Sequence, residues 1–150
     1  ISESPYLKQL ETLKLWKNEI SDDSIELMVV SGNFTHLRIL MLNDNLITPA
    51  GAAMLASTSL FPQLLTLNLF SNDIGDGGAL AFASSKNFSS LELLYLGENK
   101  ITDQGAVTLI ESQYFPRLKV LDLAMNPLGE ATMMAAFKVN NKGKLQIVYR

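Results

Sequence analysis

Residues 37–47 read LRILMLNDNLI, and residues 64–74 read LLTLNLFSNDI. Both fit the motif L-x-x-L-x-L-x-x-N-x-[IL], which recurs in three more stretches of the chain. A fixed period of about 20–50 residues is the signature of a stacked array, because one unit cannot bury its apolar face alone. The motif recurs every 27 residues, beginning at Leu10, Leu37, Leu64, Leu91 and Leu118, and Leu145 stands one more interval along the chain. Motif positions are numbered below from that first leucine.

Leucines at positions 4 and 6 of the motif alternate with polar or variable residues. This period of two predicts a short strand with one buried face. Because the strands recur in one direction, they must pair in parallel, and each pair needs a crossover connection. The sequence therefore predicts two inward ladders, one of Leu13, Leu40, Leu67, Leu94 and Leu121, and one of Leu15, Leu42, Leu69, Leu96 and Leu123.

The second half of each repeat has the pattern of a helix, as in residues 48–59 (TPAGAAMLASTS) and 102–112 (TDQGAVTLIES). Apolar residues recur there at spacings of three and four, which predicts one buried stripe on each helix. Ser21, Thr48 and Thr102 stand where an N-cap residue belongs. The closing slot of each repeat is interpreted as a core spacer rather than part of a cofactor site, and it holds Phe34, Phe61, Phe88 and Phe115.

Asparagine occupies position 9 of all five complete motifs. Its side-chain amide carries both a donor and an acceptor, and buried backbone groups in a turn cost about 1–3 kcal/mol each when unpaired. A stack of amides that pairs such groups from one turn to the next explains the column better than ligand binding does. We therefore predict a structural ladder of Asn18, Asn45, Asn72, Asn99 and Asn126.

The strand motif, together with helices such as TDQGAVTLI and TPAGAAMLA, resembles the leucine-rich repeats of the ribonuclease-inhibitor type. The resemblance covers residues 10–148. It implies an α/β solenoid, a right-handed βα superhelix or horseshoe with a parallel sheet on the concave face and helices on the convex face. It also implies protein binding with no shared catalytic residues. The repeat is slightly shorter than is typical of that type and the chain has no cysteine, so ribonuclease inhibition is not inferred.

The chain is predicted to form one domain over residues 1–150. Residues 1–10 (ISESPYLKQL) align with residues 109–118 (LIESQYFPRL), so residues 1–9 have the sequence of a partial repeat. That partial repeat is either a worn N-terminal cap or part of a longer array. At the other end, a terminal strand is expected from Leu145, although Arg150 then falls on a leucine position.

Composition narrows the classes of function. Apolar residues make up 47% of the chain and charged residues 18%, as in a globular core. The net charge is −3 and the basic residues are scattered, so neither nucleic acid nor an anionic membrane is an expected partner. Without cysteine there are no disulfides or cysteine zinc sites, and a reducing compartment is favoured. We expect a cytoplasmic protein, or one secreted into a host cytosol if it is an effector, with no cofactor and no bound metal.

The variable positions of the strand motif point to a tailored surface, because a purely structural requirement would repeat with the period. Positions 5, 7 and 8 change at every repeat and include the only tryptophan of the chain. Aromatic residues and methionine are enriched at the centres of protein interfaces, although β-propensity alone also favours aromatics in strands. The predicted protein-binding residues of the concave face are Lys14, Trp16, Lys17, Met41, Asn43, Asp44, Asn68, Phe70, Tyr95, Glu98, Asp122 and Tyr149.

The first functional hypothesis is therefore a non-catalytic module, monomeric alone, that binds another protein. A second hypothesis is a regulator of a partner enzyme, of the GTPase-activating or inhibitor type, in which Lys14 or Lys17 reaches into the partner's pocket. An enzyme is not expected. The single histidine, His36, lies in a loop slot filled elsewhere by unrelated residues, and no phosphate-binding glycine motif is present.

Overall fold

The computed structural model describes residues 5–140, 143 and 145–150, and residues 1–4 of the expected partial repeat lie outside this part of the chain. Strands and helices alternate along it without exception after a short 3-10 helix. The order is η1 (Pro5–Gln9), β1 (Thr12–Lys14), α1 (Asp22–Ser31), β2 (Ile39–Met41), α2 (Pro49–Ser57), β3 (Thr66–Asn68), α3 (Gly75–Ala83), β4 (Leu93–Tyr95), α4 (Asp103–Ile110), β5 (Val120–Asp122), α5 (Glu130–Asn140) and β6 (Gln146–Val148).

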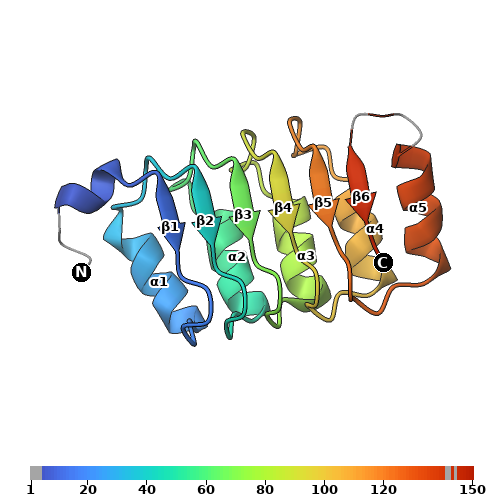
Figure 1. Cartoon of the computed structure of the whole chain (residues 1–150), viewed down its shortest axis with the longest axis horizontal. Helices are drawn as coiled ribbons and strands as arrows, with labels where there is room; N and C mark the ends of the chain where they lie inside the picture. Colours follow the sequence, from blue (N-terminus) through green and yellow to red (C-terminus); the bar gives the residue numbers. More distant parts are fainter. Residues whose placement is uncertain (1–4, 141–142, 144) are drawn as a thin grey trace.

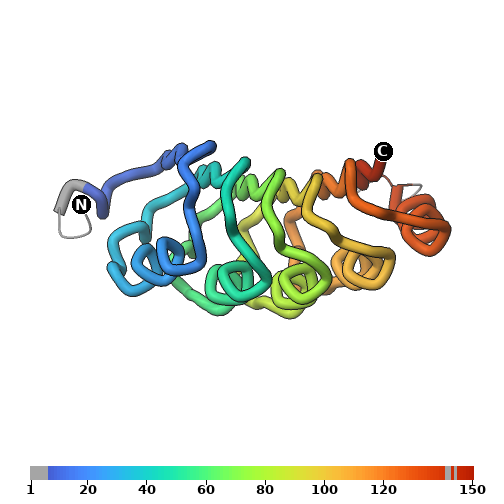
Figure 2. The backbone as a smooth tube through the Cα atoms, turned by 90° about the horizontal axis from the view of Figure 1, so that it is seen from below, coloured from blue at the N-terminus to red at the C-terminus, as the bar shows by residue number. Residues whose placement is uncertain are grey.

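The strands form one parallel sheet in the order β1-β2-β3-β4-β5-β6, so each strand pairs with its neighbours in sequence. The register follows the period of the sequence from β1 to β5, with Leu13 opposite Leu40 and Leu94 opposite Leu121. All five helices lie on one side of the sheet (Figure 1). Figure 2 shows the row of strands along one side of a shallow curve and the helices along the other. The predicted α/β solenoid of leucine-rich repeats is therefore confirmed.

The core fills the space between the sheet and the helices. The position-4 residues Leu40, Leu94 and Leu121 have no exposed surface, and the position-6 leucines of the inner repeats are equally buried. Each fully buried leucine contributes about 1.5–3 kcal/mol through the hydrophobic effect. Phe82 and Phe88 meet at the end of one repeat with ring centroids 5.6 Å apart, so this phenylalanine slot belongs to the core.

The N-terminal capping of the helices repeats only in part along the chain. Thr48 and Thr102 cap α2 and α4, since their side chains accept hydrogen bonds from the Ala50 and Gln104 N–H groups. Ser21 precedes α1 but makes no side-chain capping bond. Carboxylates then link one helix start to the next. Asp76 accepts from the Thr102 N–H, from the Thr102 hydroxyl and from the Gly105 N–H.

The last strand departs from the period, and the expected register of residues 145–150 is wrong by one residue. Leu121 pairs with Ile147 rather than Val148, and Ile147 is buried. Tyr149 therefore takes the place of a position-6 leucine and packs partly buried against the core, instead of standing in the position-5 column on the opposite face of the sheet. In the unshifted register the Arg150 guanidinium would enter a leucine site, and burying an unpaired charge is costly. After the shift Arg150 is exposed, with its guanidinium 5.6 Å from the centre of the Tyr149 ring.

Among the residues that the structure describes, no helix is long and apolar enough to cross a membrane.

Candidate functional site: the open face of the sheet

Side chains at positions 3 and 5 of the motif project from the face of the sheet opposite the helices. In β2 the pattern is half-buried, buried, half-buried for Ile39, Leu40 and Met41, and β3, β4 and β5 repeat it. The alternation arises because successive residues of a strand point to opposite faces. Within the described chain no helix or strand covers this face (Figure 2). It is called the open face below.

Apolar side chains are spread along the open face and its edge. Trp16, just after β1, is 53% exposed, and Met125, just after β5, is 68% exposed. Met41 in β2 and Tyr95 in β4 are half-buried. Phe70, which follows β3, is half-buried as well. A row of exposed and half-buried large apolar groups on one face is typical of an interaction surface.

Phe70 is held by its neighbour in the next repeat. A β-carbon added to Gly97 would lie 2.7 Å from two carbons of the Phe70 ring and 2.9 Å from the Ala124 carbonyl oxygen. The ring therefore lies over the backbone of Gly97, in the turn that follows β4. The sequence places Phe70 and Gly97 in one column, but only the structure shows that the small residue makes room for the large one.

Two predicted binding residues also have local structural roles. The side-chain oxygen of Asn68 accepts the Phe70 N–H at 2.9 Å, and the oxygen of Asp122 accepts the Ala124 N–H at 2.9 Å. These bonds tie position 5 to the backbone at position 7 and fix the turn that ends the strand. Such side chains are already oriented before any partner binds, although part of their hydrogen-bonding capacity is used internally.

A repeated backbone conformation underlies position 8. The φ angle is between 52° and 60° at Lys17, Asp44, Ser71, Glu98 and Met125, which is the left-handed region. An L-residue pays about 1–2 kcal/mol for this conformation. The variable side chains at position 8 thus sit on an invariant sharp turn at the C-terminal edge of the sheet, a requirement that the residue types alone do not reveal.

Asn43 and Asp44 interact at this edge. The Asn43 amide donates to a carboxylate oxygen of Asp44 at 2.7 Å. The Asn43 Oδ1 atom is buried without a hydrogen-bond partner within the described residues. Because an unpaired buried oxygen is unfavourable, this site is suited to a donor brought by water or by a partner.

A shallow groove of about 500 Å³ that the sequence did not predict runs along the same edge. Its apolar wall includes Leu46, which is 59% exposed, together with Met125 and Pro127. Its polar centre is the ion pair between Lys100 Nζ and Asp73 Oδ1 at 2.8 Å. Position 10 of the motif holds Leu46, Asp73, Lys100 and Pro127. The variation of residue type in this column is the sequence signal that could have indicated the groove.

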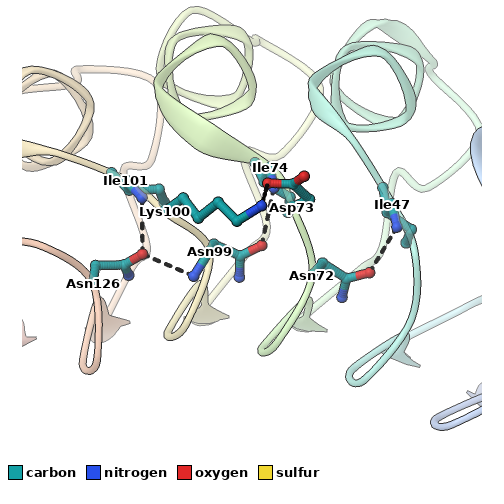
Figure 3. Close-up of polar contacts among 8 residues, drawn as sticks. All are labelled: Ile47, Asn72, Asp73, Ile74, Asn99, Lys100, Ile101 and Asn126. Atoms are coloured by element: carbon teal, nitrogen blue, oxygen red, sulfur yellow. Dashed lines mark hydrogen bonds and ion pairs between the residues drawn. The ribbon is translucent and has the colours of Figure 1, made fainter.

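The asparagines at position 9 lie behind this edge and face the neighbouring turns. Asn72 accepts the Ile47 N–H at 3.0 Å and donates to the Leu42 and Leu69 carbonyls. Asn99 is fully buried, and Asn126 accepts the N–H groups of both Asn99 and Ile101. Figure 3 shows these amides bridging consecutive turns, with the exposed Lys100–Asp73 pair outside them. Their hydrogen bonds are therefore directed into the repeats.

Charges are distributed unevenly along the face. Lys14 and Lys17 stand at the β1 end, whereas Glu98 and Asp122 stand near β4 and β5. The second ion pair, Lys119 Nζ to Glu92 at 2.7 Å, joins two repeats at the opposite edge of the strands. Exposed pairs of this kind contribute about 0–1 kcal/mol, so they matter more for orientation than for stability.

Groups that could bind a metal ion or transfer protons are few among the described residues. They contain no cluster of three or more histidine, aspartate or glutamate side chains that could hold a metal ion. His36 is exposed, and its Nδ1 atom lies 3.2 Å from the Thr35 hydroxyl. The carboxylate with a clearly shifted pKa is Asp103, at a helix start away from the open face. The Thr132 hydroxyl bond, and then the Gly129 N–H bond, lower that pKa.

Comparison with known families agrees with the fold. A family model described as Leucine Rich repeat matches residues 35–56, 62–83 and 89–109. No match was found among curated proteins. With six parallel strands and five alternating α-helices in its described part, this chain is a leucine-rich-repeat protein. Members of this family are typically binding scaffolds for other proteins rather than catalysts, and a protein-interaction module is the class of function that the fold indicates.

Proposed function

We propose that the protein binds another protein across the open face of the sheet, with the position-8 turns and the neighbouring groove forming the edge of the contact. The observation that carries this proposal is the uncovered row of Trp16, Met41, Phe70, Tyr95 and Met125. Large apolar side chains of these types supply most of the binding energy in known interfaces. Burying them against a partner would also remove an unfavourable exposed surface.

The dimensions of the sheet fit this role. Six strands at a spacing of about 4.8 Å span more than 20 Å, and a stable interface needs about 800 Å² from each partner. The positive β1 end and the negative β4–β5 end would orient a partner of complementary polarity. Phe70 is already fixed over Gly97, so binding would lose little side-chain entropy at that point.

The experiment is affinity capture from cell extract followed by mass spectrometry. A Trp16→Ala, Phe70→Ala, Tyr95→Ala variant is compared with the unmodified protein. A matched control, Val30→Ala with Leu80→Ala, removes exposed apolar groups from the helical side instead. We expect the first variant to lose the captured partner and the control to retain it. A folded triple variant that keeps every partner would show that the open face is not the binding surface.

A further inference from the structure

The first repeat is packed on one side only. Leu10, Leu13 and Leu15 are half-buried, whereas Leu37, Leu40 and Leu42 in the same positions of the second repeat have no exposed surface. Leu27 on α1 is 70% exposed, whereas Met54, 27 residues later on α2, is half-buried against the core. Within the described chain no α-helix lies beyond α1, and only the short 3-10 helix η1 precedes β1 (Figure 1).

An apolar hollow of about 430 Å³ lies on this unpacked side of the first repeat. We call this surface the N-terminal flank. It comprises Leu7, Leu13, Leu15, Ser24, Leu27, Met28, Ser31 and Phe34. In every inner repeat the corresponding surface is covered by the preceding repeat, as where Gly78 of α3 fits closely against Ala52 of α2. The flank is thus the continuation of an interface that the molecule already uses four times.

The asparagine ladder stops at this surface. In each later repeat the position-9 amide donates to a carbonyl 30 residues earlier, as from Asn45 to Leu15 at 2.9 Å and from Asn99 to Leu69 at 2.8 Å. The Asn18 amide is exposed, and among the described residues it donates only to the Trp16 carbonyl of its own repeat. The Asn18 side-chain amide therefore has a donor N–H that, among the described residues, bonds no carbonyl of an earlier turn.

A column of hydroxyl side chains also joins neighbouring helices, but only in the later repeats. Ser85 and Ser112 each donate to a carbonyl of the preceding helix, that of Ala56 and Ala83 respectively. Ser31 stands in the same slot of the first repeat, but its hydroxyl donates to Met28 in its own helix. In the second repeat the same slot holds Thr58, which accepts the Leu60 N–H although a preceding helix, α1, is present. The polar evidence at the N-terminal flank is therefore the end of the asparagine ladder.

The approach to β1 matches that of an inner strand. The Leu10 N–H donates to the Leu7 carbonyl at 3.2 Å, as the Leu37 N–H does to Phe34 and the Leu64 N–H to Phe61. Leu7 thus occupies the closing slot that phenylalanine fills in the later repeats. The backbone enters β1 through the same turn that ends every repeat.

We propose that the N-terminal flank is a stacking surface for one further leucine-rich repeat, joined to β1 through residues 1–9. Its strand would pair in parallel with β1, its turn carbonyls would receive the Asn18 amide, and its helix would cover Leu27. A second copy of the chain fits less well. Two β1 edges related by a two-fold axis would run antiparallel, and the Asn18 amide would then miss the acceptors that a parallel neighbour presents.

The test completes the missing repeat from the chain's own sequence. Residues 91–108 fused ahead of Ile1 make a full 27-residue unit together with residues 1–9. A Leu27→Cys substitution in both the native and the extended chain gives a unique thiol, since the protein has no other cysteine. The matched control carries the same extension, with aspartate in place of the copied Leu94 and Leu96.

We expect the extension to raise the urea midpoint and the m-value together, because more surface becomes buried in one cooperative unit. The labelling rate of the thiol at position 27 should fall about tenfold or more, as in a protected site. Asn18→Ala should lower the urea midpoint in the extended chain and leave it nearly unchanged in the native one. The aspartate control should show none of these effects.

Two results would overturn the proposal. One is an extended chain with the midpoint, m-value and labelling rate of the aspartate control, which would mean that no repeat stacks on the flank. The other is a native chain that sediments as a dimer and that Leu27→Asp converts to monomers, since a second copy would then cover the surface.

Discussion

The ring of Phe70 fills the space that a side chain at position 97 would need, since a β-carbon on Gly97 would come within 2.7 Å of two ring carbons. The two residues belong to consecutive repeats and share motif position 7. A bulky aromatic group on the open face is thus held in one orientation by the absence of a side chain on the next turn.

Gly97→Ala should therefore destabilise the protein by about 1–3 kcal/mol, the usual range for overpacking. The added methyl group must displace the Phe70 ring and press on the Ala124 carbonyl. Urea unfolding measures the loss, and a double-mutant cycle with Phe70→Ala isolates the contact. We expect Gly97→Ala to cost less in the Phe70→Ala background. Equal costs in both backgrounds would show that the ring is not what the methyl group meets.

The asparagine ladder predicts a contrast between two chemically identical substitutions. Asn99→Ala leaves the buried Ile74 N–H unpaired, at about 1–3 kcal/mol, and removes one of the two amides that donate to the Leu69 carbonyl. Asn18→Ala removes one exposed bond to Trp16 and should change the stability by less than about 0.5 kcal/mol. Thermal and urea unfolding of the two variants decides the matter. Comparable losses would contradict the burial argument.

The asparagine at the centre of the array adds a second comparison. Asn72→Ala should broaden the unfolding transition as well as lower it, because damage at the middle repeat uncouples the two halves of a nearest-neighbour array. Asn126 lies beside the last repeat, and its substitution should leave the transition sharp even though it accepts two N–H groups. The width of the urea transition is the measurement. Abolished partner binding with unchanged stability would instead mean that the ladder faces a ligand.

Much of this architecture could be predicted from the sequence, because the period and the burial pattern are the same signal. Leu40, Leu67 and Leu94 recur every 27 residues since each must fill the same site in the core, and the strand register follows from that. The register of β6 could not be predicted in this way. There the period and the position of the Arg150 charge conflict, and keeping the charge exposed outweighs the repeat.

The open face was harder to predict than the core. The variation of positions 5 and 7 from repeat to repeat predicts that residues such as Trp16 and Met41 lie on this face, and Met41 does alternate with the buried Leu40. The stacking of Phe70 on Gly97 and the groove at position 10 depend on the directions of side chains from different repeats, which no single motif contains. The left-handed backbone at position 8 was hidden because asparagine and glycine, the usual markers of positive φ, do not occupy it.

That backbone conformation predicts how position 8 responds to substitution. Met125→Gly should change the stability little, because the strain that glycine relieves offsets the chain entropy that it adds. Met125→Ile should cost about 1–2 kcal/mol or more, since a β-branched residue resists a φ of 60°. The side chain is exposed, so lost packing does not explain the difference. Urea midpoints for the two variants are the measurement, and isoleucine as stable as glycine would contradict the assigned conformation.

The last prediction concerns pH. Asp103 accepts hydrogen bonds from the Thr132 hydroxyl and from the Gly129 N–H, and these bonds lower its pKa from the ordinary value of 3.8. A carboxylate with a lower pKa in the folded state stabilises the fold above its unfolded pKa and loses that contribution as the pH falls through the folded pKa. The stability difference between the native protein and Asp103→Asn should therefore be constant at neutral pH and shrink below pH 3.8.

Thr132→Val removes the largest cause of the lowered pKa and should reduce the same difference. Urea unfolding from pH 7 down to pH 2.5 follows the change, with Asp23→Asn, an exposed aspartate in the first turn of α1, as the control. A difference that stays constant across the whole acid range would mean that the Asp103 bonds between α4 and α5 do not favour the charged carboxylate.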